Sequence, residues 1–218
     1  MRECTEQVFL KDVVNHGMTV LMDNGIYRHL RFVSKGEHSW NQWFEIVTWP
    51  GRLAYSGDMG TFVFARLEDM FEFFRVRPAD EKAQLHINTG YWAEKLLAVD
   101  RDHRNNSEKA FSEDCLREHV EDYLKDWIED SQLSAKDQEQ LREEVEEQVF
   151  RYAEDGEHEA HRALREFSCE IGGHKFEFSD TWEWDLREYT FRFAWCCYAL
   201  AWAIQQYDAA KLDLEVAS

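Results

Sequence analysis

The sequence contains none of the cysteine spacings that hold a disulfide framework or a structural zinc ion. Its five cysteines are odd in number, and no two are spaced as Cys-x-x-Cys. Cys196 and Cys197 are neighbours in an apolar run, and adjacent side chains on a helix point about 100° apart. This arrangement is typical of buried, reduced thiols. We therefore expect a cytoplasmic protein.

Long hydrophobic runs are also missing. The longest apolar stretch, Phe193 to Ile204, has twelve residues, whereas a membrane-spanning helix needs about 20. The first residues, MRECTEQVFLKD, lack the apolar core of a signal peptide. We expect no membrane partner.

Basic residues are scarce relative to acidic ones. Lys and Arg number 25 against 44 Asp and Glu, a net charge of −19. Such a chain repels phosphate backbones, so we expect no direct binding of nucleic acid. It favours basic partners, among them proteins that themselves bind nucleic acid. Alternatively, the charge only keeps an aromatic-rich chain in solution.

Three catalytic or nucleotide-binding motifs are absent: GxxxxGK[ST], GxGxxG and GxSxG. The glycine-rich segment from Ser56 to Thr61 lacks a lysine and joins two apolar runs, which predicts a hairpin turn. The sequence therefore predicts no catalytic residues and no cofactor, and it favours a non-enzymatic role.

Aromatic residues are abundant, at 15% of the chain, and the first third is typical of β-structure. Strands are predicted over 18–22, 26–33, 40–49, 52–56 and 61–65, with Asp23-Asn24-Gly25 as a tight turn. The next part predicts helices over 67–75, 91–99, 107–130, 134–154, 157–169 and 189–208. Trp182 and Trp184 alternate with polar residues, as on an edge strand.

The expected fold class is α+β, as one domain over residues 1–218. Residues 1–66 are mainly β, in a curved antiparallel sheet of about five strands, and residues 67–218 are mainly α. They include an acidic helical hairpin over 107–155, with Ser112 and Ser134 as N-caps, and a long apolar C-terminal helix. Only two prolines interrupt the chain.

The negative charge is concentrated in one segment. Residues 107–159 hold 19 acidic and 6 basic residues, a net of −13. The acids that helical spacing places toward solvent are the candidate partner-binding residues: Glu113, Glu118, Glu121, Asp122, Glu129, Asp130, Glu143, Glu144, Glu146 and Glu147.

A weaker candidate is a metal site. Asp155, His158 and His161 are spaced i, i+3, i+6, and carboxylate with imidazole is a ligand set for Zn²⁺ or Mn²⁺. However, Gly156 interrupts the start of that helix, and histidines in an acidic run are more often solvated. The sequence therefore favours no bound metal.

A different hypothesis is a small enzyme or ligand-binding protein with a pocket in the aromatic sheet. Its walls would be Trp40, Trp43, Trp49, Tyr55, Asp58, Trp182 and Trp184. Core packing is the competing interpretation of these aromatics. Their surplus also leaves room for an apolar homodimer interface.

Several stretches resemble a family of small acidic phage and prophage proteins whose activity is not established. They are Thr48–Leu53, Ser56–Thr61, Arg66–Arg75, Gly90–Leu96 and Tyr189–Tyr198. The resemblance implies a viral origin and the cytoplasm of a host cell. With the acidic segment, it suggests an inhibitor that binds the basic surface of a host defence complex, of the anti-CRISPR or anti-restriction type, by mimicking nucleic acid. A phage adaptor protein is the alternative.

Overall fold

The computed structural model describes residues 3–36, 40–75, 85–100 and 108–216, and the chain divides into two compact units. Unit 1 combines residues Met1–Lys109 with Tyr189–Ser218, and unit 2 is the insertion Ala110–Glu188. Each unit has its own hydrophobic core. The sequence predicts one domain, whereas the structure has two compact units. The α+β class is confirmed.

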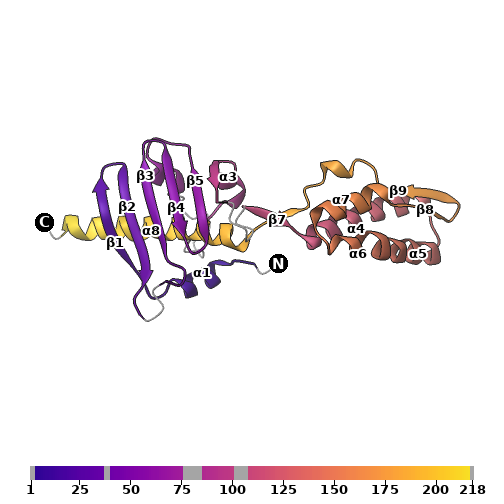
Figure 1. Cartoon of the computed structure of the whole chain (residues 1–218), viewed down its shortest axis with the longest axis horizontal. Coiled ribbons are helices and arrows are strands. Elements are labelled where there is room, and N and C mark those ends of the chain that lie inside the picture. Colours follow the sequence, from indigo (N-terminus) through magenta and orange to yellow (C-terminus); the bar gives the residue numbers. More distant parts are fainter. Residues whose placement is uncertain (1–2, 37–39, 76–84, 101–107, 217–218) are drawn as a thin grey trace. The chain divides into compact units, whose positions relative to one another are not determined.

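Unit 1 is built on an antiparallel meander of six strands (Figure 1). Neighbouring strands are consecutive in the chain, so short turns join most of them. The strands are β1 His16–Asn24, β2 Tyr27–Ser34, β3 Phe44–Trp49, β4 Arg52–Gly57, β5 Gly60–Phe64 and β6 Leu96–Val99.

The predicted hairpin turns are confirmed. Gly25 has φ +63° and follows β1, where a left-handed backbone closes a tight turn. Gly57 and Gly60 pair across the next glycine-rich turn. Gly57 is required for space, because a Cβ there would lie 2.2 Å from the carbonyl oxygen of Trp43. The segment 56–61 is therefore a hairpin.

The prediction of a helix over 91–99 is wrong in its second half. Helix α3 covers only Thr89–Ala93, and the chain then forms strand β6. Val99 and Phe62 are register partners of β6 and β5. Pairing with the open edge of β5 thus outweighs the local helix pattern of Leu96–Val99.

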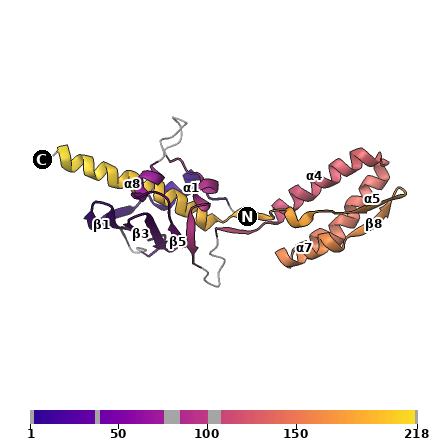
Figure 2. The same cartoon turned by 90° about the horizontal axis from the view of Figure 1, so that it is seen from above.

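Helices α1 (Glu6–Asp12), α2 (Met70–Phe74), α3 and α8 (Phe191–Val216) contribute to the core of unit 1 together with the sheet. Figure 2 shows α1 and α8 on the same side of the strands. Aromatic rings fill the space between them: the Phe44 ring centroid lies 4.6 Å from that of Phe32 and 5.7 Å from that of Trp195. Met70, Phe71 and Phe74 are buried as predicted.

One charged pair lies at the edge of this core. Arg28 is 7% exposed and donates to both carboxylate oxygens of Asp69, at 2.8 Å each. Its guanidinium carbon also lies 4.5 Å from the centroid of the Phe71 ring. Asp69 is at the same time the N-cap of α2. This explains why α2 begins at Met70, three residues after the predicted helix start.

In unit 2 the main helices are α4 Glu113–Ser131, α5 Ala135–Val145, the π-helical turn η1 Glu146–Phe150, α6 Arg151–Ala153 and α7 Glu157–Glu166. A two-stranded sheet, β8 Ser168–Ile171 and β9 His174–Glu177, packs on them. Strands β7 Lys109–Phe111 and β10 Arg187–Tyr189 pair where the chain enters and leaves the insertion.

The predicted helical hairpin is confirmed, and both serine caps are present. The Ser112 hydroxyl accepts from the Cys115 N–H at 3.2 Å, and that of Ser134 accepts from the Asp137 N–H at 3.3 Å. The predicted helix start at Ser107 lies outside the described residues, and residues 109–111 are a strand. Trp182 is not on a strand, because Thr181–Glu183 form the 3-10 turn η2.

Among the described residues, no helix combines the length and apolar character that crossing a membrane requires.

Candidate functional site

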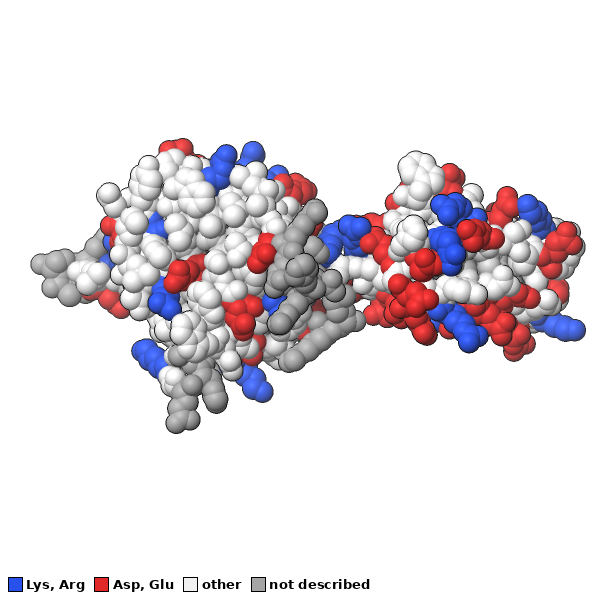
Figure 3. Space-filling model, in the orientation of Figure 1, with Lys and Arg blue, Asp and Glu red and all other residues white. Residues whose placement is uncertain are grey.

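Unit 2 holds most of the negative charge of the protein. Its 79 residues include 25 acidic and 9 basic side chains, a net of −16. Unit 1 holds 19 acidic and 16 basic side chains, a net of −3. On the face shown in Figure 3, acidic side chains cover much of unit 2, with Lys and Arg among them. The charge is therefore a property of the insertion.

Helix α4 presents one row of carboxylates opposite its buried face. Leu116, Val120 and Leu124 are buried, and the row on the other side is Glu118, Asp122, Asp126 and Glu129, all exposed. Glu118 and Glu129 are eleven positions apart, or about 16 Å along a helix that rises 1.5 Å per residue. A single DNA strand carries about five phosphates over that length, at 3.4 Å each. The four carboxylates are about 5.5 Å apart on average along the helix, so their spacing is wider than that of the phosphates.

A second row runs along α5 and the π-helical turn. Glu139, Glu143 and Glu147 are spaced four residues apart and are all exposed. Neither Asp126 nor Glu139 is among the acids predicted from the sequence. Counting each helix position from the buried residues outward places both of them in these rows.

The ten predicted acids are all accessible, nine of them exposed and Glu144 partly buried. Two of them form ion pairs between the helices of the hairpin: Glu121 pairs with Arg142, and Glu146 pairs with Arg117. Glu144 accepts from the amide of Gln148. Within the described part of the chain, the other seven make no ion pair: Glu113, Glu118, Asp122, Glu129, Asp130, Glu143 and Glu147.

The helix dipole of α4 acts with opposite sign on three of these seven acids. Glu113 lies in the first turn of α4, where a negative charge stabilises the helix. Glu129 and Asp130 lie in the last turn, which contains no basic residue. There the dipole is negative, and each like charge costs about 0.3–1 kcal/mol. The fold gains nothing from Glu129 and Asp130.

The candidate metal ligands are not brought together. Gly156 has φ +110° and separates Asp155 from α7, so Asp155 does not share the helical periodicity of His158 and His161. No three His, Cys, Asp or Glu side chains among the described residues are arranged to hold a metal ion.

The seven residues of the proposed aromatic pocket are spread over both units. Tyr55 is fully buried in the core of unit 1. Trp40 is 69% exposed, and Trp182 and Trp184 belong to unit 2. Trp184 stacks on His119, with ring centroids 5.4 Å apart, and packs against the core of unit 2.

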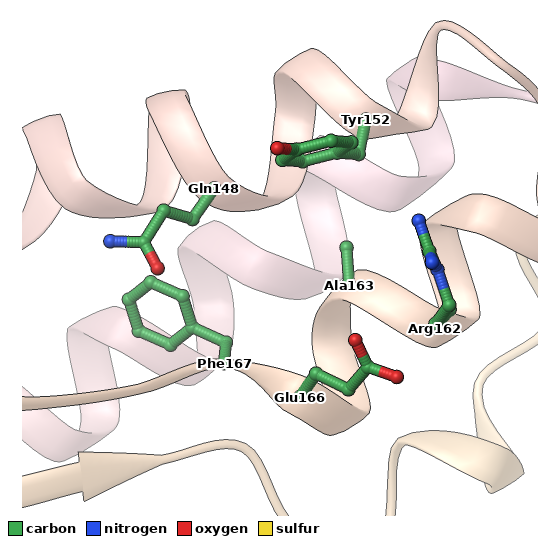
Figure 4. A pocket seen from close by; sticks show the side chains of 6 residues that line it. All are labelled: Gln148, Tyr152, Arg162, Ala163, Glu166 and Phe167. Carbon is green, nitrogen blue, oxygen red and sulfur yellow. The ribbon is translucent and has the colours of Figure 1, made fainter.

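Unit 2 does contain a pocket that sequence reasoning missed. It has a volume of about 560 Å³ and is lined by Gln148, Tyr152, Arg162, Ala163, Glu166 and Phe167. Figure 4 shows Gln148 and Tyr152 on one helix facing the other four residues. The pattern in the sequence that could have pointed to it is a pair at i, i+4 on each helix. The pairs are Gln148 with Tyr152 and Arg162 with Glu166.

No protein-family model, curated protein or solved structure matches the chain.

Proposed function

We propose that the protein is a non-catalytic inhibitor that binds the basic, nucleic-acid-binding surface of another protein through unit 2. The observation that most strongly supports this proposal is the net charge of −16 on one compact insertion, compared with −3 on the rest of the chain. A charge needed only for solubility has no reason to be concentrated in this way.

The placement of individual acids supports the same proposal. Glu129 and Asp130 lie at the end of α4 where they oppose the helix dipole. Glu118 and Asp122 are exposed and make no ion pair with the described residues. Residues that add nothing to the fold are candidates for function. Complementary charge would speed association with a basic partner and make it sensitive to salt.

The target class to test first is a host defence complex with a basic channel, such as a restriction or CRISPR complex. This choice rests on the resemblance to phage proteins and on a host cytoplasmic location, which are part of the proposal. The aromatic-pocket enzyme loses support, because Tyr55 is fully buried in the core of unit 1 and Trp184 packs against the core of unit 2. A phage adaptor would also present an acidic surface, so the experiment must separate the two.

The test is affinity capture from bacterial lysate at low and at high salt, identified by mass spectrometry. We expect a nucleic-acid-binding complex that is released at high salt and whose DNA or RNA binding the protein blocks at a one-to-one ratio. The variant Glu118→Gln/Asp122→Asn/Glu129→Gln should lose capture. The matched control, Glu68→Gln/Glu94→Gln/Asp213→Asn, removes three exposed acids from unit 1 and should retain it. Equal loss in both variants, or capture of phage structural proteins only, would refute the inhibitor.

A further inference from the structure

The pocket of unit 2 lies between the segment η1–α6 and helix α7 (Figure 4). Its volume of about 560 Å³ is within the range of roughly 300–1,000 Å³ found for binding pockets. All six lining residues come from unit 2. The pocket is therefore part of the same insertion that carries the negative charge.

The base of the pocket is apolar and one wall is aromatic. Phe167 is 3% exposed, and Ala163 belongs to the buried face of α7. Tyr152 stands above them with 48% of its surface exposed. Among the described residues, its hydroxyl has no hydrogen-bond partner. A large, half-exposed tyrosine with a free polar end is typical of binding surfaces.

The two charged residues of the rim differ in availability. Arg162 pairs with Glu159 one turn earlier, at 2.5 Å, so its charge is compensated within the helix. Glu166 has only a long contact of 3.9 Å with Arg165, and its side chain is 63% exposed. Of the two charged residues at the rim, Glu166 is therefore the one whose side chain can accept new hydrogen bonds.

The backbone is irregular where the pocket begins. The Arg151 N–H bonds to the carbonyl oxygen of Glu146, five residues earlier, which defines the π-helical turn. Gln148 lies in this turn, and Tyr152 lies two residues after its end. Such turns are rare and occur frequently at functional sites.

We infer that this pocket binds an arginine side chain of the basic partner; the inference rests on the proposed function and names the anchor of that interface. The methylene groups of arginine fit the apolar base of Phe167 and Ala163. The planar guanidinium stacks on the ring of Tyr152 and donates to the carboxylate of Glu166. The surrounding net charge of −16 attracts the cation. Lysine lacks the planar group that stacks and donates along two directions.

The experiment is an NMR titration of the full chain with the peptide acetyl-Gly-Arg-Gly-amide. The signals observed are the Ala163 methyl group and the Gln148 side-chain amide. We expect saturable shifts of both. A citrulline peptide keeps the shape but loses the charge, and it should bind at least about tenfold more weakly, since charge-assisted hydrogen bonds are the stronger ones. Lysine should also bind more weakly.

Three variants locate the site. Tyr152→Ala and Glu166→Gln should each abolish saturation, whereas Tyr152→Phe keeps the aromatic face and should retain binding within about threefold, because the stacking is with the ring. Glu68→Gln removes one exposed charge from unit 1, outside the pocket, and should retain binding. If Tyr152→Ala unfolds, Glu166→Gln still decides, because its side chain is exposed.

Equal binding of arginine and citrulline peptides, or shifts spread over the acidic rows without saturation at Ala163, would overturn the arginine site. That failure is distinct from failure of the proposed function. If Glu166→Gln has no effect on either peptide or partner while charge neutralisation on α4 abolishes capture, the inhibitor stands without this anchor. If the peptide saturates the pocket but neutralisation of the α4 acids leaves capture unchanged, the arginine-binding pocket is supported and the proposed acidic inhibitor is refuted.

Discussion

Glu146, the first residue of the π-helical turn, accepts two hydrogen bonds from the guanidinium of Arg117 on α4, each 2.9 Å long. Four residues further along α4, Glu121 pairs with Arg142, which lies four residues before Glu146. Moving forward on one helix and backward on the other is the register of an antiparallel hairpin. The hydrogen bonds from Arg117 lower the pKa of Glu146.

The first prediction concerns this pair. Both side chains are about half exposed, so Glu146→Gln should cost at most about 1 kcal/mol of unfolding free energy. Arg117→Ala should cost somewhat more, because the guanidinium also lies 4.1 Å from the centroid of the Phe150 ring. Urea denaturation of both single variants and the double variant measures the coupling. A coupling energy above about 2 kcal/mol would contradict an exposed pair.

The second prediction concerns Glu129 and Asp130 at the end of α4. Replacing them by Gln and Asn removes two negative charges from the negative end of the helix dipole. Each change should stabilise the protein by about 0.3–1 kcal/mol, while the double variant should capture less of a basic partner. Thermal unfolding and capture are measured on the same samples.

Glu113→Gln is the matched control, because Glu113 lies at the opposite end of α4. Its removal should lower stability instead. A Glu129/Asp130 variant that is less stable than the original protein would show that these acids serve the fold after all.

The sequence predicts the elements of this fold better than their association into units. Leu116, Val120 and Leu124 follow helical spacing, so α4 and its acidic face can be derived from the pattern. The two-unit division cannot, because the strands at both ends of the insertion, Lys109–Phe111 and Arg187–Tyr189, have three residues each. Strand β6 was missed for a related reason: it is defined by its pairing with β5.

The pocket residues could be predicted even less. Gln148 and Tyr152 are placed by a π-helical turn, which shifts the phase of the helix after Val145. A sequence pattern of period 3.6 cannot reveal the extra residue that a π-helical turn contains. Predicting the acidic residues requires only knowing which helix faces are exposed, and all ten predicted acids are accessible.

The third prediction concerns the partly buried pair Arg28–Asp69. Burial opposes the charge of Asp69, but hydrogen bonds from Arg28 and from the Phe71 N–H lower its pKa overall. Asp69→Asn should cost about 2–4 kcal/mol, because it leaves the guanidinium of Arg28, itself buried, without its counter-charge. Chemical denaturation measures this cost. Glu68→Gln, at an exposed position, is the control and should have little effect.

The fourth prediction is a loss of stability on mild acidification. Burial lowers the pKa of His16 below the ordinary 6.5, against a hydrogen bond to the carbonyl oxygen of Gln42 and the charge of Asp12. That bond, 3.0 Å from Nε2, fixes the proton on Nε2. The buried Nδ1 has no partner among the described residues. Protonation would place an unsatisfied N–H there.

A histidine whose pKa is lower in the folded state contributes stability above pH 6.5, and this contribution is lost as the pH falls through the lower folded-state value. Unfolding free energies between pH 8 and 5 should therefore decline. In His16→Gln this decline should be smaller. An identical pH dependence of both proteins would assign it to other histidines.

The last prediction compares two tyrosine hydroxyls in unit 1. The Tyr55 hydroxyl is fully buried and has no hydrogen-bond partner among the described residues, and burial raises its pKa well above the ordinary value. The Tyr207 hydroxyl donates to Asp23 at 2.8 Å and accepts from Arg28.

Tyr55→Phe should be neutral or stabilising by up to about 1 kcal/mol, because it removes an unsatisfied polar group. Tyr207→Phe should instead cost about 1–2 kcal/mol of unfolding free energy. It removes the hydroxyl that bonds to two charged groups, Asp23 and Arg28. Denaturant unfolding of the two variants in parallel decides. If Tyr55→Phe were the more damaging change, the Tyr55 hydroxyl would have to be bonded to an ordered water molecule in the core, which such a buried group can retain.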